Sequence, residues 1–272
     1  MHFRFKKALA ALVIAASMVP ISGVEVSATS TTIISNSTSI TTPYSSLPKN
    51  TKVSQCLVTV NSSDGTKTYR IFEQGNKKLR STYIRLHGCA ACSLTTVLSA
   101  YSKKYANYTP EKTSQILEKK VFGTSVWKKN YTKNKMPVSL NGITKILKYC
   151  GIKAEYVRSF KDADAVARIT AHLKEGKPVI IETNCRKQSN GKYGKYTNKW
   201  AGGKHTMVLL GIASNGKVIV ADSANRTWAG KNQRIKYTKM SSLVHYMYPC
   251  KKVSNKYYYS SQKTTGGYIL VD

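Results

Sequence analysis

The chain has 272 residues and a net charge of +32, with 44 Lys and Arg against 12 Asp and Glu. The basic residues are scattered among tyrosines, and no zinc-finger spacing, phosphate loop or recognised nucleic-acid module accompanies them, so we expect no nucleic-acid partner and no cofactor. A strongly positive surface instead favours solubility or contact with a polyanion other than nucleic acid.

A secretory signal peptide is predicted over residues 1–28. Three basic residues precede an apolar run over residues 8–21, and Val26-Ser-Ala28 matches a small-residue cleavage site. The run is shorter than the roughly 20 apolar residues that a membrane span needs. We therefore expect cleavage after Ala28, no transmembrane segment in the mature chain, and a secreted, extracellular protein.

Residues 29–52 come next, and their composition predicts a flexible linker. Between Thr29 and Leu47, 12 of 19 residues are Ser or Thr and none is charged. Such a stretch has too little apolar surface to bury for stable folding. Residues 53–272 remain, which suits a single domain, and we expect that domain to be a monomer.

The pattern of apolar residues in this domain places most helices before most strands. Proline at a helix start, acidic residues in a first turn and glycine after a last turn mark several boundaries. Helices are expected at 89–104, Pro110–Val121, Leu140–Tyr149 and Asp162–Leu173. Strands are expected at Val53–Val60, Thr66–Phe72, Val179–Glu182, Thr206–Ile212, Lys217–Ala221, Lys256–Tyr259 and Tyr268–Val271. A helical part followed by an antiparallel sheet is an α+β arrangement.

The segment Leu86–Tyr101 combines a glycine turn with an apolar helix. Cys89 follows Gly88 and falls in the first turn of that helix. Unpaired backbone N–H groups and the helix dipole favour a thiolate at this position. Cys89 is therefore the candidate nucleophile.

Two later segments offer an imidazole and a carboxylate. Residues 203–212 and 218–225 have the pattern of short buried strands joined by the turn Ser214-Asn-Gly216. His205 begins the first strand and Asp222 ends the second, so antiparallel pairing sets them side by side. An imidazole held by a carboxylate can take the thiol proton and later protonate a leaving amine.

Each of these residues also has a simpler interpretation. Cys89 could form half of a disulfide, and His205 could be a core histidine whose ring nitrogens are hydrogen-bonded within the fold. Asp222 could cap a turn. Their order along the chain favours a Cys-His-Asp triad over three unrelated roles. His87 is a competing imidazole, but a position two residues before Cys89 does not give the facing geometry that a base needs.

The cysteine segment carries a resemblance to a known family. Its sequence GCAACSLTTVLSAY is similar to the nucleophile helix of papain-like bacterial cysteine peptidases related to the bacteriocin-leader-processing enzymes, cysteine-peptidase family thirty-nine. Leu173–Ile181, Gly203–Ile212 and Val220–Asn225 resemble the family's Gly-Lys-Pro-Val-Ile strand, Gly-His strand and Asp-Pro strand end. The resemblance implies a papain-like fold, in which a helical lobe with the nucleophile helix packs on an antiparallel β-sheet.

The resemblance also implies catalytic roles for Cys89, His205, Asp222 and Gln74. In the family, a glutamine upstream of the cysteine helps to stabilise the oxyanion of the tetrahedral intermediate, and Gln74 takes that position together with the backbone N–H of Cys89. Two departures from the family pattern are visible. Ala-Ala follows Cys89 where the family has Gly-Pro, and Lys204 separates the glycine from His205.

The remaining cysteines allow up to two disulfides with one free thiol, and the sequence gives no pairing among Cys56, Cys92, Cys150, Cys185 and Cys250. A bond between Cys89 and Cys92, one helical turn apart, would be strained. No Cys/His spacing matches a zinc site, and His172 and His245 are isolated, so we expect no metal.

These observations predict an exported cysteine peptidase that hydrolyses a peptide or isopeptide bond in a peptide or protein substrate. The alternatives are a peptidoglycan endopeptidase or amidase of papain-like fold, a transglutaminase-like acyltransferase, and a non-catalytic cationic envelope-binding protein on the same scaffold. Loss of residues 1–28, which hold three basic residues and one acidic residue, leaves a net charge of +30. That charge suits an anionic cell-wall polymer such as teichoic acid, although a role in solubility explains it equally well.

Overall fold

The structure, a computed structural model, describes residues 32–33, 55–62, 65–75, 82–123, 138–184, 200, 203–224, 234–258 and 262–272. The predicted signal peptide and most of the predicted linker lie outside these residues. Within the described part of the chain, no helix is long and apolar enough to cross a membrane.

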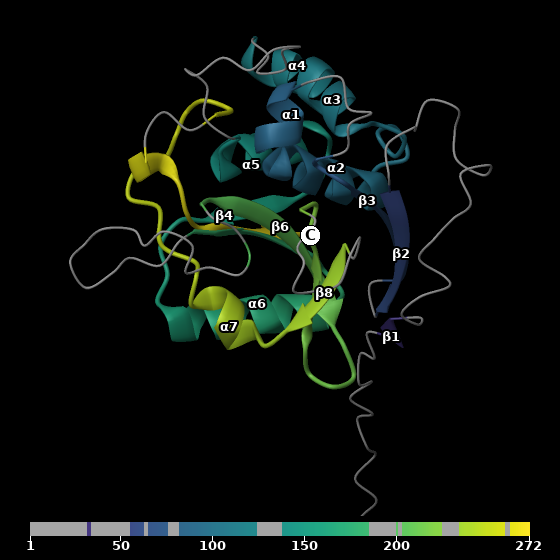
Figure 1. Cartoon of the computed structure of the whole chain (residues 1–272), viewed down its shortest axis with the longest axis vertical. Helices are drawn as coiled ribbons and strands as arrows, with labels where there is room; N and C mark the ends of the chain where they lie inside the picture. The colour runs from purple at the N-terminus through teal and green to yellow at the C-terminus, as the bar shows by residue number, and fades with distance from the viewer. Residues whose placement is uncertain are drawn as a thin grey trace, which may run out of the picture.

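A six-stranded antiparallel sheet forms the centre of the fold (Figure 1). Its strands are β4 Ala154–Val157, β5 Val179–Thr183, β6 His205–Ile212, β7 Val218–Ala221, β8 Ile235–Thr238 and β9 Tyr268–Val271. Their order in the sheet is β4-β9-β5-β6-β7-β8. β6 and β7 form the predicted hairpin, in which Ala213 N–H donates to Lys217 O (2.8 Å) and Gly216 supplies the positive φ of 73° that the turn requires.

Helices cover both faces of this sheet (Figure 1). One side carries α1 Thr82–His87, α2 Cys89–Tyr101, α3 Pro110–Lys112, the π-helical turn Thr113–Leu117, α4 Glu118–Phe122 and α5 Leu140–Tyr149. The other side carries α6 Asp162–Lys174 and α7 Met240–Val244. Along β5, Ile180 packs with α2 and α5, whereas Val179 and Ile181 pack with α6 and α7. The continuous apolar sequence of β5 therefore reflects a sheet buried on both faces.

α2 is the central helix of its layer. Every residue from Cys89 to Leu98 is buried, so the helix lacks the polar stripe of a surface helix. Two of its hydroxyl groups bond to a neighbouring strand: Thr96 Oγ1 donates to Arg70 O (3.0 Å), and Ser99 Oγ accepts from Arg70 N–H (2.9 Å). Arg70 lies in β3, so α2 satisfies backbone groups on the edge of that strand.

A second, three-stranded sheet contains β3 and has the order β1-β2-β3. Its strands are β1 Thr32–Ile33, β2 Gln55–Ser62 and β3 Gly65–Phe72. β2 and β3 match the predicted pair around Ser63-Asp-Gly65 to within two residues. β1 comes from the predicted linker and pairs with the second half of β2.

Some elements differ from the sequence-based expectation. The strand predicted at Lys256–Tyr259 is wrong, because among its described residues only Tyr258 forms a single bridge, to Val138. The helix predicted at 89–104 ends at Tyr101, since Ser102 is extended (φ −142°, ψ 113°). The helix predicted from Pro110 contains the π-helical turn. Six of the described elements were not predicted, namely α1, α7, β1, β4, β8 and the 3-10 helix Gln262–Thr264.

Candidate active site

Cys89 is the first residue of α2 and directly follows the turn that joins α1 to α2. Gly88 makes this turn, and a β-carbon at Gly88 would lie 2.3 Å from the carbonyl oxygen of Ile84. Glycine is therefore needed for the two helices to approach so closely. The residue that follows is nearly buried: Cys89 is 5% exposed, and its thiol is free.

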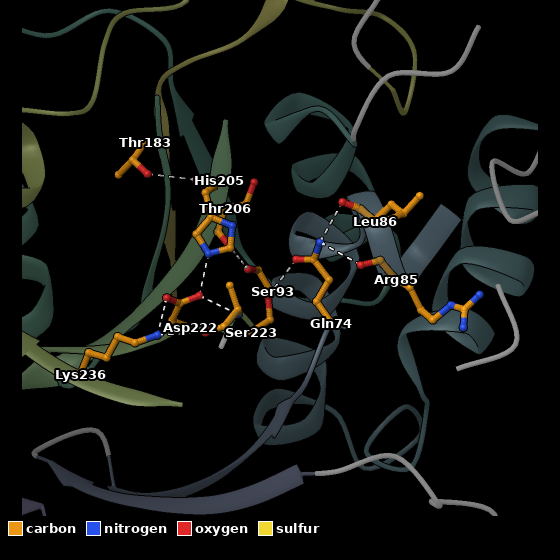
Figure 2. Close-up of polar contacts among 11 residues, drawn as sticks. Gln74, Arg85, Leu86, Ser93, Thr183, His205, Thr206, Asp222, Ser223 and Lys236 are labelled. Atoms are coloured by element: carbon orange, nitrogen blue, oxygen red, sulfur yellow. Dashed lines mark hydrogen bonds and ion pairs between the residues drawn. The ribbon is translucent and has the colours of Figure 1, made fainter. Parts of the chain in front are cut away.

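His205 and Asp222 meet at one end of the hairpin. His205 begins β6, Asp222 directly follows β7, and His205 Nε2 lies 2.6 Å from Asp222 Oδ1. Both side chains are buried. Ser93 Oγ on α2 donates to Thr206 O (3.2 Å), which ties the residue after His205 to the helix that carries Cys89 (Figure 2).

The charges of these side chains favour a thiolate–imidazolium pair. Burial alone would raise the pKa of Cys89, but a hydrogen bond with His205 and the charge of its ring bring that pKa below its ordinary value. Burial also opposes protonation of His205, yet the Asp222 carboxylate and the Cys89 sulfur raise its pKa to about 9. Because Nε2 is committed to Asp222, Nδ1 is the ring nitrogen left for the thiol.

Asp222 has a second cationic partner, Lys236, which sequence reasoning missed. The Lys236 side chain is 0% exposed, and its Nζ donates to Asp222 Oδ2 (2.5 Å) and to Ala224 O (3.0 Å). Ala224 N–H donates to Asp222 Oδ1 (2.8 Å), which also takes part in the contact with His205. Although burial opposes ionisation, His205 and Lys236 hold the pKa of Asp222 well below its usual range. Figure 2 shows the two cations on different sides of the carboxylate.

Gln74 lies between the end of α1 and the residue that follows Asp222 (Figure 2). Its Nε2 donates to Leu86 O (3.1 Å), and the same nitrogen lies 3.5 Å from Arg85 O. On the other side, Gln74 N–H donates to Ser223 O (3.0 Å), and Ser223 Oγ lies 3.5 Å from Gln74 Oε1. The structure thus places Gln74 against the segment just before the candidate nucleophile and ties it to the end of the hairpin.

The other described histidines have partners of their own. The ring of His87 packs against Tyr83 with centroids 5.7 Å apart. His172 is buried and contacts a carbonyl oxygen of β9 (3.0 Å), and His245 packs edge-on to Tyr246. Within the described residues, no group of three or more His, Cys, Asp and Glu side chains could hold a metal ion.

The cysteines whose side chains the structure describes are all free thiols: Cys89, Cys92, Cys150 and Cys250. Cys56 and Cys185 lie outside the described side chains. Cys92, one turn after Cys89, differs from it electrostatically. Burial and the neighbouring Cys89 sulfur raise the pKa of Cys92, which keeps it a protonated thiol.

The fold defines the class of the protein. An α+β arrangement with a cysteine at the start of a central helix, packed on an antiparallel sheet, is that of the papain-like cysteine peptidases. The family model described as Peptidase_C39 like family matches residues 66–265, more than half of the chain. The chain therefore belongs to the C39-like peptidase family, which confirms the resemblance seen in the sequence. The matched region includes all four residues that the resemblance singled out.

Comparison with individual proteins adds one solved structure. No curated protein matches the sequence. Among solved structures, a crystal structure described as that of a C39-like peptidase from Bacillus anthracis matches 68% of this chain and 88% of that chain, with 15% sequence identity and a TM-score of 0.39.

Proposed function

We propose that the protein is an exported cysteine peptidase that hydrolyses a peptide or isopeptide bond. In this proposal Cys89 is the nucleophile, His205 is the general base and acid, and Asp222 orients the imidazole. One observation carries the proposal. His205 makes a buried contact of 2.6 Å with Asp222, and the same histidine lowers the pKa of the Cys89 thiol at the start of α2. A nucleophile, a base and an orienting group in this order form the triad of nucleophilic catalysis.

Acylation begins with attack of the Cys89 sulfur on the carbonyl carbon of the scissile bond. The C–S bond forms while the carbonyl π electrons move to oxygen and give a tetrahedral oxyanion. The His205 imidazolium donates its proton to the leaving nitrogen, and the C–N bond breaks. A free amine leaves, and a thioester remains on Cys89.

Deacylation uses water as the second nucleophile. Neutral His205 takes a proton from the water as its oxygen attacks the thioester carbon. Collapse of the second tetrahedral intermediate breaks the C–S bond and releases the carboxylic acid and the Cys89 thiolate. Asp222 stays ionised throughout and holds Nε2 of the ring, so that Nδ1 faces the reacting atoms.

We assign stabilisation of the oxyanion to the Gln74 carboxamide and the Cys89 backbone N–H. A carboxamide nitrogen carries two hydrogens. One donates to Leu86 O at 3.1 Å, whereas the 3.5 Å separation from Arg85 O is too long for a strong bond. The second hydrogen is therefore left for substrate. Gln74→Ala should lower kcat by about 100- to 1000-fold, the range measured for loss of one such donor.

Thiol alkylation tests the nucleophile assignment without knowledge of the substrate. Iodoacetamide at neutral pH should modify Cys89 before Cys92, because the pKa of Cys92 is raised. Cys89→Ala should abolish cleavage of a peptide library, while the matched variant Cys92→Ala should retain it. An inert Cys89, or cleavage by Cys89→Ala, contradicts the proposal. A reactive Cys89 with no cleavage of any peptide favours the non-catalytic envelope-binding alternative.

A second candidate function, that of a peptidoglycan endopeptidase or amidase, uses the same chemistry on the stem peptides of a cell wall. The net charge of +30 after the predicted signal cleavage favours it. An anionic wall polymer such as teichoic acid attracts a surface of this sign and raises the concentration of enzyme beside its substrate. Digestion of purified cell wall, with Cys89→Ala as the control, separates this candidate from a peptidase of other proteins.

Salt dependence tests the role of the charge. Attachment of the mature protein to purified walls should weaken steeply as the Debye length falls from about 10 Å at 0.1 M salt to about 3 Å at 1 M. Cleavage of a small neutral peptide should change little, because Cys89 and His205 are buried and so are less screened. Equal attachment to walls stripped of teichoic acid would assign the basic surface to solubility.

A further inference from the structure

We infer that Lys236 is a positioning residue of the candidate active site, which fixes both the orientation and the charge of Asp222. Its positive charge balances the Asp222 carboxylate, so that Cys89 and His205 can form an ion pair with no net charge left in the buried site. This inference rests on the proposed function and adds to it a residue outside the triad.

The sheet register brings Lys236 to Asp222. Lys236 lies opposite Val220 in the β7–β8 pairing, and Asp222 follows β7 directly. The side chain of Lys236 is 0% exposed, and its contacts of 2.5 Å with Asp222 Oδ2 and 3.0 Å with Ala224 O hold the ammonium group in place. Burial of an ammonium group is costly, and an apolar residue of similar volume is usually at least as good for stability. A buried lysine at this point therefore indicates a role beyond stability.

Among the residues that the structure describes, the other ionisable groups near Asp222 are neutral or paired. Cys92 on α2 has a raised pKa and stays a neutral thiol. Arg234, which precedes β8, pairs through Nη2 with Glu73 Oε1 at 2.9 Å. Within the described part of the chain, the charge of Lys236 therefore balances that of Asp222, while the His205 imidazolium balances the Cys89 thiolate.

A further pair of opposite charges lies next to His205. Burial raises the pKa of Glu182 to about 7, and the nearby Lys204 acts against this rise. Neither Glu182 nor Lys204 is changed in the Lys236 variants. A comparison between the wild-type protein and a Lys236 variant therefore isolates the effect of Lys236.

Loss of the Lys236 charge has a defined consequence for both reacting groups. The thiolate, the imidazolium and the carboxylate together would then carry one net negative charge in a buried site. That charge favours the protonated thiol, so the pKa of Cys89 rises. It also holds the proton on His205 more firmly, so the pKa of His205 rises above its present value of about 9. Both limbs of the pH profile should move to higher pH.

The test compares the pH dependence of Cys89 alkylation by iodoacetamide in three variants, with mass mapping to separate Cys89 from the other thiols. Lys236→Met keeps the length of the side chain without its charge, and the midpoint should rise by on the order of one pH unit. Lys236→Arg keeps the charge and should restore most of the wild-type profile. Val220→Ala is the matched control: it removes buried volume opposite Lys236 and lowers stability, but should leave the midpoint unchanged.

The outcomes separate this inference from the proposed function. A wild-type Cys89 with the ordinary cysteine pKa, or a wild-type protein that cleaves no peptide, counts against the proposed function. A wild-type profile with a lowered midpoint that Lys236→Met does not move overturns the role of Lys236 alone. A midpoint shift in Val220→Ala as large as that in Lys236→Met overturns it too, because the effect would then follow from stability.

A second test covers the case in which Lys236→Met does not fold. Asp222→Asn leaves the Lys236 charge buried without its carboxylate, so its melting temperature should fall. Addition of Lys236→Met to Asp222→Asn removes the unpaired charge and should recover part of that loss, without recovery of peptide cleavage. If the double variant melts no higher than Asp222→Asn, the two side chains are not coupled, and the inference fails.

Discussion

The two halves of the candidate site are held in place by different forces. The half that carries Cys89 depends on packing, since α2 is buried on all sides and Gly88 lets it approach α1 closely. The half that carries His205 depends on charge, through buried contacts of 2.6 and 2.5 Å that link the imidazole, Asp222 and Lys236. A thiol needs a fixed place and a cation beside it, whereas an imidazole needs a partner that sets its orientation. Different mutations should therefore disable each half.

The largest effect is expected in the charged half. His205→Ala removes the group that accepts and returns the proton, so kcat/KM should fall by at least about 1000-fold while the fold is retained. The matched control is His172→Ala, which removes a buried histidine that contacts β9 and should retain peptide cleavage. Kinetics with a peptide substrate and circular dichroism measure the two effects. Near-normal activity of His205→Ala would instead make His87 the candidate base.

The packed half should respond to a single methyl group. Gly88→Ala places a β-carbon 2.3 Å from Ile84 O, so α1 or α2 must shift and carry Cys89 with it. We expect a loss of about 1–3 kcal/mol of stability and a fall in kcat of about 100-fold from misplacement of the sulfur. Gly203→Ala is the control, because a β-carbon there meets nothing within 4 Å. Denaturant unfolding and kinetics that give equal results for both variants would contradict the packing argument.

The pH profile should report the charge network directly. Activity should be high between the lowered pKa of Cys89 and the raised pKa of His205, and should fall as pH rises through about 9. The raised pKa of His205 also increases the free energy of unfolding. This contribution is complete below the unfolded-state pKa of about 6.5 and is lost as pH rises through about 9. A pH series of kcat/KM and of melting temperature measures both. An alkaline midpoint near 6.5 would mean that Asp222 does not stabilise the imidazolium.

The smallest effect is expected where the two halves are joined. Ser93→Ala removes the hydrogen bond from α2 to Thr206 O, at a cost of about 1 kcal/mol in stability. Because this bond fixes the residue after His205 relative to the helix of Cys89, kcat should fall several-fold. Ser99→Ala removes a hydroxyl of the same helix that contacts Arg70 instead. It should lower stability to a similar extent with kcat unchanged, and a similar loss of kcat in both would argue against a specific link.

The sequence predicts best those elements whose ends carry local signals. α5 runs over Leu140–Tyr149 as predicted, because Ser139 Oγ accepts from Gly142 N–H (3.0 Å) at its start and Gly151 adopts a positive φ of 80° after its end. The β6–β7 hairpin follows from its turn residues and two buried strands. Antiparallel pairing then brings His205 and Asp222 to the same end of the hairpin, but the two side chains share a face because the register shifts by one residue between Leu209 and Gly211, which the sequence does not signal.

Sequence reasoning fails where a distant partner decides the outcome. The tyrosines of Lys256–Tyr259 indicate a strand by their β propensity, which measures packing on a pleated surface. Here the carbonyls of Lys256 and Tyr257 bind Ser139 at the start of α5, and Tyr257 is buried against that helix. The buried position of Lys236 could not be predicted for the same reason. A lysine in a strand usually faces solvent, but Lys236 is buried with its ammonium group bonded to the carboxylate of Asp222 and to Ala224 O.

The position of β9 in the sheet has a consequence for the timing of synthesis. This strand comes latest in the chain among those of the six-stranded sheet, yet it lies between β4 and β5 and pairs with both. During synthesis, Cys89, His205 and Asp222 emerge from the ribosome before β9 does. Until β9 emerges, β5 can pair with β6 but its other edge has no partner strand. Contacts between such distant segments form slowly. The nascent protein therefore cannot complete the support of its candidate site before residues 268–271 are free to join the sheet.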